Sequence, residues 1–96
     1  MDKIIVGIVP EFKFKTDDNP YHDRYCSIDL YTKRLSDEGA ICIGLIPQNG
    51  SIPNEVLDMC DCFLLQGGLK IDHIHYQTIN YALKNNKPLL GICLGM

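Results

Sequence analysis

The sequence predicts an α/β fold in which helices cover both faces of a parallel β-sheet. Four short apolar runs recur along the chain, and proline or glycine follows most of them. Near-continuous apolar runs are typical of strands that are buried on both faces. Segments with helical spacing of apolar residues separate these runs, and the resulting β-α-β-α-β-α-β order is typical of a parallel sheet.

The first half of the chain supplies two strands and one long helix. Residues 3–9 form an apolar run that ends at a proline, and a polar loop follows. From about residue 21 to residue 38 apolar side chains recur at helical spacing, and Gly39 stands where a helix C-cap belongs. Residues 40–46 form the second apolar run, which ends at Pro47. We expect both runs to be buried strands.

The second half supplies the remaining two strands and two helices. A short helix is expected over residues 54–59, and residues 62–65 form the third apolar run. Apolar positions between residues 71 and 83 lie on one helical face, with Asp72 as the N-cap. The fourth run covers residues 89–92. The chain therefore has one domain's worth of elements and no internal repeat.

The composition limits the classes of binding partner and the cellular compartment that we expect. The net charge is -3 with a pI near 5.4, which argues against nucleic acid and against an anionic membrane. The sequence contains neither a membrane-length apolar run nor a signal-peptide core, and its five cysteines have no disulfide framework spacing. We therefore expect a cytoplasmic protein with free thiols and no cofactor. Cys60 and Cys62 lack the second pair that a metal site needs, so no metal is expected either.

The segment around Cys93 has the form glycine, any residue, nucleophile, any residue, glycine. Gly91 and Gly95 permit a tight strand-to-helix turn that would hold the Cys93 sulfur above the end of the sheet. The helix dipole favours the thiolate there, and the N–H of Leu94 points to where an oxyanion would form. The alternative is a glycine-rich strand end with a structural cysteine.

A second glycine segment follows the third strand. Gly67 and Gly68 let the backbone approach a ligand, and one of them is positioned to supply a second oxyanion N–H. Taken alone, the two glycines indicate a flexible strand-to-helix turn. Because ligands bind beyond the carboxyl ends of parallel strands, we expect this turn and Cys93 to share one edge of the sheet.

Two segments of the chain carry a resemblance. Residues 88–96 are Pro-Leu-Leu-Gly-Ile-Cys-Leu-Gly-Met, and residues 60–68 are Cys-Asp-Cys-Phe-Leu-Leu-Gln-Gly-Gly. Both segments resemble the class I glutamine amidotransferase superfamily. The strand-Pro-Glu start over residues 3–11 resembles its gamma-glutamyl hydrolase-like branch. The resemblance implies a flavodoxin-like three-layer sandwich. It also implies attack of Cys93 on a gamma-glutamyl amide such as glutamine, through a thioester that water hydrolyses. Lys70 stands where the branch usually has an acid, which leaves the amine half of the substrate open.

The resemblance also implies that residues 1–96 are the N-terminal portion of one such domain, cut just after the nucleophile. In this superfamily a His-x-Glu pair near the C-terminus supplies the base and its carboxylate. His22, His73 and His75 have no carboxylate at a suggestive spacing, and we interpret them as surface or helix-cap residues. The chain alone is therefore expected to be inactive, and to associate with itself or with a partner synthase. The alternatives are a non-catalytic binding module or a thiol-redox module with the same fold.

Overall fold

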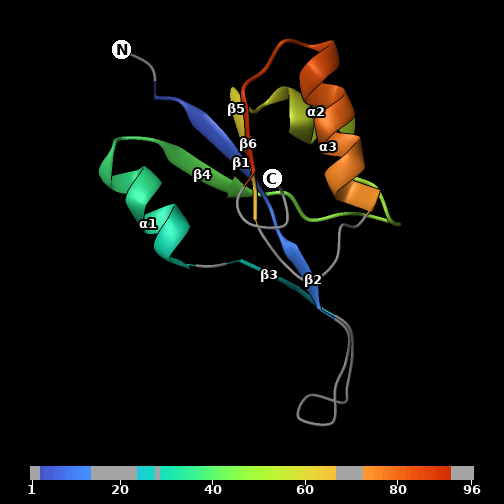
Figure 1. The fold of residues 1–96 in the computed structure, drawn as a ribbon, viewed down its shortest axis with the longest axis horizontal. Coiled ribbons are helices and arrows are strands. Elements are labelled where there is room, and N and C mark those ends of the chain that lie inside the picture. The colour runs from blue at the N-terminus through green and yellow to red at the C-terminus, as the bar shows by residue number, and fades with distance from the viewer. Residues whose placement is uncertain (1–2, 14–23, 28, 67–72, 92–96) are drawn as a thin grey trace, which may run out of the picture.

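The computed structural model describes residues 3–13, 24–27, 29–66 and 73–91. Four strands form a parallel sheet in the order β4-β1-β5-β6 (Figure 1). Their bounds are Ile5–Val9 for β1, Ile41–Gly44 for β4, Cys62–Leu65 for β5 and Leu89–Gly91 for β6. The expected parallel sheet of four apolar strands is confirmed.

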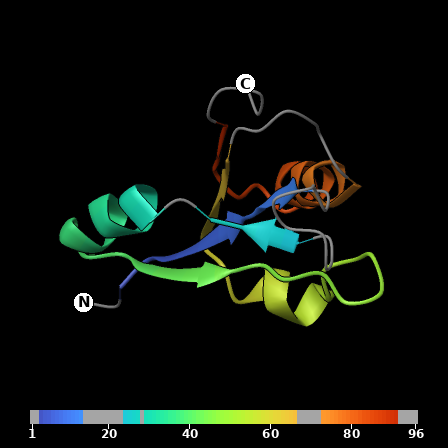
Figure 2. The same cartoon turned by 90° about the horizontal axis from the view of Figure 1, so that it is seen from below.

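Three helices connect these strands, and they lie on both faces of the sheet (Figures 1 and 2). Their bounds are Asp29–Asp37 for α1, Asn54–Asp58 for α2 and His73–Lys84 for α3. The β1-to-β4 connection and the two later connections run in opposite directions across the sheet. Because such crossovers are right-handed, the first helix and the other two must cover opposite faces. The α/β architecture predicted from the sequence is therefore confirmed.

Alternation along the two central strands builds a separate apolar layer on each face. Val6, Ile8 and Leu64 form one cluster, against which Tyr31 and Leu35 of α1 pack. The cluster on the other face is larger and joins β1 and β5 to α2 and α3; its buried members are Val9, Leu45, Ile52, Leu57, Cys60, Phe63, Leu65, Ile74 and Ala82. Because successive side chains of a strand point to opposite faces of the sheet, the apolar inner strands supply a buried layer on each face.

The end of α1 matches the sequence prediction. Gly39 has a φ of +92°, its N–H donates to the Ser36 carbonyl, and the N–H of Ala40 donates to the Leu35 carbonyl. This pair of bonds is the Schellman motif, in which glycine relieves the strain of a left-handed residue. The C-cap assigned to Gly39 is confirmed.

The predicted start of the first helix, near residue 21, is wrong. Arg24–Cys26 forms strand β3, which pairs antiparallel with β2 at Glu11–Lys13 in a separate two-stranded sheet. Buried Pro10 separates β1 from β2, because proline has no N–H to continue a ladder. The helix therefore begins at Asp29 rather than near residue 21.

The outer strands are less buried than expected. Residues 40–46 read as a strand buried on both faces, yet β4 lies at one edge of the sheet and Ile41 and Gly44 are exposed. The strand expected at residues 89–92 lies at the other edge, as β6. Full burial on both faces is restricted to β1 and most of β5.

Side-chain hydrogen bonds join several elements near the amino-terminal ends of the strands. The Tyr81 hydroxyl donates to the Asp58 carboxylate, and Lys87 Nζ lies 3.3 Å from the Tyr81 oxygen. This carboxylate bond raises the pKa of Tyr81. The Asp61 carboxylate accepts the Ile5 N–H at 2.8 Å. The Tyr81 bond ties α3 to α2, and the Asp61 bond separately ties the start of β1 to the segment just before β5. Within the described residues, no helix is long and apolar enough to cross a membrane.

Gly7 sits at the tightest point of the larger core. A Cβ at this position would lie 2.7 Å from Cys60 Sγ and 3.0 Å from side-chain carbons of Leu45 and Phe63. We therefore expect Gly7→Ala to lower the free energy of unfolding by about 1–3 kcal/mol, the usual cost of overpacking. Urea denaturation checks this. Gly44→Ala is the matched control, because a Cβ on that strand glycine meets nothing within 4 Å, and an equal loss in both variants would contradict the packing argument.

Candidate functional site

The carboxyl ends of the four parallel strands define the edge where ligands bind in this class of sheet. Gly91, the last residue of β6, is paired in register with Leu65, the last residue of β5. The chain therefore leaves two adjacent strands at the same level. Gly91 is the one predicted elbow glycine that the structure describes; the other predicted site residues, Gly67, Gly68, Cys93, Leu94 and Gly95, lie outside the described residues.

Gln66 follows β5 directly and is held rigidly at this edge. Its side chain is 2% exposed, and its Nε2 donates a 2.8 Å hydrogen bond to Ser27 Oγ. Ser27 lies between β3 and α1, so the bond joins segments that are far apart in sequence. A buried amide must be hydrogen-bonded to avoid a desolvation cost. The contact joins the end of β5 to the segment before α1, and no local feature of the sequence indicates it.

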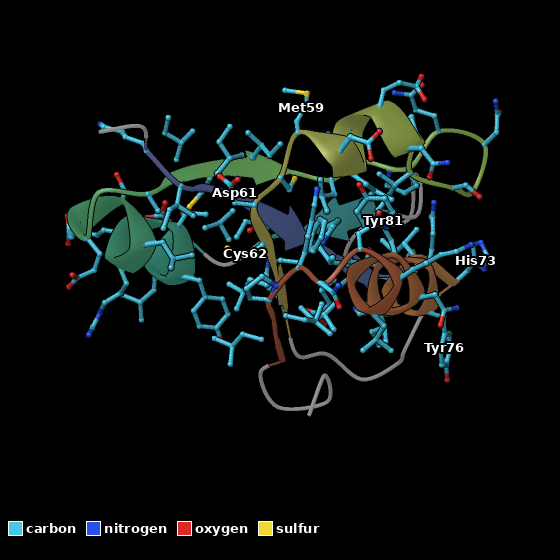
Figure 3. The ribbon with its side chains drawn as sticks, turned by 90° about the horizontal axis from the view of Figure 1, so that it is seen from above. Met59, Asp61, Cys62, His73, Tyr76 and Tyr81 are labelled. Carbon is cyan, nitrogen blue, oxygen red and sulfur yellow. The ribbon has the colours of Figure 1, made fainter. Side chains whose placement is uncertain are left out.

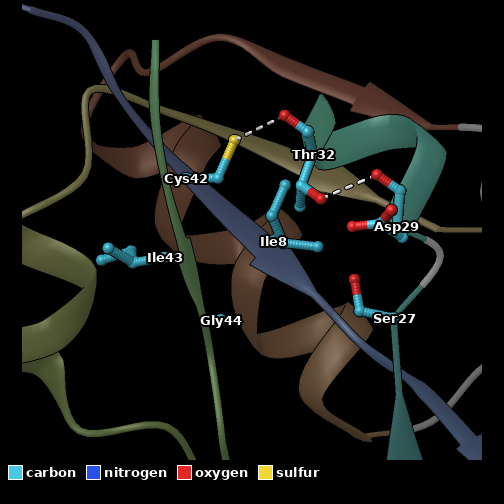
Figure 4. A pocket seen from close by; sticks show the side chains of 7 residues that line it. All are labelled: Ile8, Ser27, Asp29, Thr32, Cys42, Ile43 and Gly44. Carbon is cyan, nitrogen blue, oxygen red and sulfur yellow. Dashed lines mark hydrogen bonds between the residues drawn. The ribbon is translucent and has the colours of Figure 1, made fainter. Parts of the chain in front are cut away.

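A cavity of about 310 Å³ opens beside Ser27, between the start of α1 and the ends of β1 and β4 (Figure 4). It is lined by Ile8, Ser27, Asp29, Thr32, Cys42, Ile43 and Gly44. The Thr32 hydroxyl donates a 2.9 Å hydrogen bond to the backbone carbonyl of Asp29, not to its carboxylate. The polar groups come from the α1 side and the apolar ones from the strands. The cavity is thus suited to a small group with one apolar and one polar side.

The loop after β4 has a structural role. Asn49 and Gly50 both have positive φ values, and Gln48 and Ser51 form a bridge across this turn. The Gln77 side-chain amide of α3 bonds both the N–H and the carbonyl of Ile52, at 2.9 Å and 2.7 Å. These bonds pin the loop to α3. The loop at this strand end is therefore committed to packing.

One of the three histidines departs from the sequence interpretation. His73 is exposed at the first position of α3, as expected (Figure 3). His75 is only 4% exposed and lies on the helix face that packs against the sheet, so its assignment as a surface residue is wrong. His22 lies outside the described residues. Among the residues with described placement, no group of three or more His, Cys, Asp or Glu side chains is arranged to hold a metal ion.

The sequence and the fold were compared with known proteins. No family model matches the chain, and no solved structure matches it at a significant level.

The described cysteines have environments that suppress thiolate formation. Burial raises the pKa of Cys42, Cys60 and Cys62, and at Cys60 the nearby Lys87 ammonium offsets part of this rise. Cys60 is enclosed in the core, with Sγ 3.5 Å from the Val56 carbonyl. Since the thiolate is the reactive species, these three thiols should react slowly at neutral pH and faster as the pH rises.

Limiting iodoacetamide at pH 7 should therefore modify Cys93 before the three described thiols. Peptide mapping by mass spectrometry identifies the modified residue. In the urea-unfolded chain all five cysteines should react at similar rates, because the environments that separate them are lost. Preferential modification of Cys60 or Cys26 in the folded chain would contradict the assignment of Cys93 as the activated thiol.

Proposed function

We propose that this chain forms the N-terminal part of a class I glutamine amidotransferase-like domain that hydrolyses gamma-glutamyl amides through Cys93. The observation that carries the proposal is the alignment of Gly91 with Leu65 on adjacent strands. It supports a single site, because the Cys93 segment and the Gly67-Gly68 segment follow these two residues at the ligand-binding edge.

The strand order supports the finer description of the fold as flavodoxin-like. Numbered along the chain, β1, β4, β5 and β6 are the first to fourth parallel strands, and their spatial order is 2-1-3-4. Flavodoxin-like sheets have the order 2-1-3-4-5, with the ligand at the switch point between the first and third strands. In this chain that point lies between β1 and β5. Gln66 and its hydrogen bond to Ser27 lie at the end of β5, beside this point.

The proposed reaction begins with attack of the Cys93 thiolate on the gamma-carbonyl carbon. The N–H of Leu94 and that of Gly67 or Gly68 stabilise the oxyanion of the tetrahedral intermediate. The intermediate collapses to a thioester, and the nitrogen leaves with an added proton as ammonia or an amine. Water then attacks the thioester, which releases the gamma-carboxylate of glutamate and restores the thiol. Because this chemistry needs a reduced cysteine, we propose a cytoplasmic site of action.

The base completes the proposed site and comes from outside these residues. No His-x-Glu triplet occurs in the 96 residues. His73 is exposed on α3, and buried His75 is part of the packing of that helix. We therefore assign the base to a His-x-Glu segment supplied by further polypeptide, as the resemblance to the superfamily implies. Ammonia released at such a site would pass to a partner synthase if the protein is an amidotransferase.

Ammonia release from L-glutamine tests the proposal. The chain alone should give no measurable turnover, since loss of general acid-base help costs about 10²–10⁴ in rate. The chain joined to the His-x-Glu segment should release ammonia from L-glutamine or an amine from a gamma-glutamyl amide. L-asparagine, which is one methylene shorter, is the control substrate. If the joined chain turns over no gamma-glutamyl compound, a binding or thiol-redox module replaces the enzyme.

A further inference from the structure

The loop between β4 and α2 contains an asparagine that is followed directly by a glycine. Asn49 and Gly50 have φ values of +54° and +84°, and both residues are exposed. Their neighbours Gln48 and Ser51 exchange two backbone hydrogen bonds across the pair, of 2.8 Å and 3.3 Å. A two-residue turn with both central residues left-handed is a type I′ turn. Asn49 and Gly50 are therefore the central residues of a tight, exposed turn.

The Asn49 side chain and the Gly50 nitrogen are both unengaged. Neither the Asn49 amide nor the Gly50 N–H makes a hydrogen bond within the part of the chain that the structure describes. Gly50 also has no side chain to hinder the approach of its nitrogen to the Asn49 side-chain carbonyl carbon, Cγ. A bond between these two atoms closes a five-membered succinimide ring. The two atoms of the pair that must react are thus accessible to each other and to water.

The turn itself holds the pair back from ring closure. In a type I′ turn the side chain of the first central residue is turned away from the following nitrogen, so the turn must open before Asn49 can cyclise. Gln77 of α3 opposes this opening, because its amide bonds the N–H and the carbonyl of Ile52 at 2.9 Å and 2.7 Å. Ile52 is 1% exposed, so it anchors the end of the loop in the core. The rate of cyclisation therefore depends on local opening of this loop.

Asn86 is a natural comparison within the same chain. It is also exposed and also has a φ of +54°. The residue after it is Lys87, which has a long side chain and whose N–H donates to the Ala82 carbonyl at 2.9 Å. The nitrogen that would attack is therefore hindered and held by the end of α3. Of the six asparagines in the sequence, only Asn49 precedes a glycine.

We propose that Asn49 is a self-modification site whose rate is set by the bonds that hold its loop to α3. The Gly50 nitrogen loses its proton and attacks the Asn49 Cγ. The side-chain nitrogen leaves as ammonia, and a succinimide remains. Water then adds to one of the two ring carbonyls, and the ring opens to aspartate or to isoaspartate. The reaction consumes only water and is independent of Cys93, so Cys93→Ala should leave its rate unchanged.

The isoaspartate product should loosen the loop. Its backbone runs through Cβ and Cγ, so the turn gains one carbon atom and the two bonds between Gln48 and Ser51 lose their register. A two-residue turn has no slack to absorb this change. We therefore expect the isoaspartate form to have a lower urea midpoint than the unmodified chain. The aspartate form keeps the normal backbone and should have nearly the same midpoint as the unmodified chain.

Incubation of the 96-residue chain at mildly alkaline pH tests the proposal. Peptide mapping by mass spectrometry follows the conversion of each asparagine to the corresponding acid. Asn49 should convert before Asn86 and before every other asparagine. Gly50→Ala should slow the conversion about tenfold or more in guanidinium chloride, where only the side chain and not the fold differs. Earlier conversion of Asn86, or equal rates for Gly50→Ala and the parent, would overturn the proposal.

Gln77→Ala tests the part that α3 plays. In the folded state it should convert Asn49 about fivefold or more faster than the parent, because the loss of two hydrogen bonds favours the open loop. In guanidinium chloride the variant and the parent should convert at one rate, faster than the folded parent. Gly7→Ala is the control, since it lowers the global stability without touching the loop, and its folded rate should stay near that of the parent. A folded parent that reacts as fast as the unfolded chain, or a Gln77→Ala variant no faster than Gly7→Ala, would overturn the proposal.

Discussion

Cys93→Ala should abolish gamma-glutamyl amide hydrolysis by the completed domain, with a loss of about 10⁴-fold or more in kcat. The thiolate is the atom that forms the thioester, so without it neither half-reaction can proceed. Ammonia release from L-glutamine measures the loss. Thermal or urea unfolding should be nearly unchanged, which separates lost chemistry from lost structure. A Cys93→Ala variant that keeps more than a small part of the rate would exclude the thioester mechanism.

Companion variants separate the nucleophile from its surroundings. Gly68→Val should reduce the rate by about 10²–10³-fold if a side chain there blocks the oxyanion donor. His22→Ala and His73→Ala should leave the rate nearly unchanged, because neither is assigned a role in catalysis. His75→Ala is a poor control, since His75 is buried and its removal leaves space in the packing under α3. Its loss of activity is informative only after correction for the unfolded fraction. If His73→Ala in a folded protein eliminated turnover, the assignment of the base to a His-x-Glu segment would be wrong.

Phe63→Ala should destabilise the chain more than any other single truncation considered. Phe63 is buried at the centre of β5, makes an edge-to-face contact with Tyr81 at 5.8 Å and fills the space above Gly7. Truncating a buried phenylalanine costs about 3–5 kcal/mol. Native domains have about 5–15 kcal/mol of total stability, so the variant should lose a large fraction of the chain's stability. Far-ultraviolet circular dichroism during a urea titration measures the change.

Leu83→Ala is the control for this prediction. Leu83 is a large apolar residue in α3, but its side chain projects into solvent. Surface substitutions of this kind usually change stability by less than about 0.5 kcal/mol. A loss of several kcal/mol at Leu83, or a loss below about 1 kcal/mol at Phe63, would show that the larger core cluster is not centred on β5.

The parts of the fold that depend on local patterns could be predicted from the sequence. β5 begins and ends at the predicted residues, because a run of apolar side chains is bounded by an aspartate and a glutamine. The C-cap at Gly39 was predictable because the left-handed residue that ends a helix is usually glycine. The parallel arrangement follows from the alternation of strands and helices. These signals lie within a few residues of the element that they specify.

The parts that depend on distant segments could not be predicted. Arg24–Cys26 becomes a strand because it pairs with Glu11–Lys13, and Tyr25 also fits the helical spacing of the residues that follow. β4 has the composition of a buried strand, but its exposure is set by its place at the edge of the sheet. The contact of Gln66 with Ser27 joins residues 39 positions apart. Nothing near either residue indicates it.

The local parts of the candidate site were likewise predictable from the sequence, and its long-range parts were not. The elbow pattern at Gly91 and the glycine pair after Gln66 are local signals, and the sequence places both after strands. That these strands are neighbours, ending at the same level, is a property of the sheet order. His75 shows the opposite case. Its local sequence fits an exposed helix start, while packing of α3 against the sheet buries it.

The most direct test of the assignment of Cys93 is covalent capture by a chloroketone analogue of L-glutamine. Its electrophilic carbon occupies the place of the gamma-amide, so an activated thiol in a gamma-glutamyl site is alkylated with loss of chloride. The adduct is located by peptide mapping, in the presence and absence of excess L-glutamine or L-asparagine. The account predicts a single adduct on Cys93 of the completed domain, suppressed by L-glutamine and not by L-asparagine. An adduct on Cys26, Cys42, Cys60 or Cys62, or a Cys93 adduct that L-glutamine does not suppress, would contradict it.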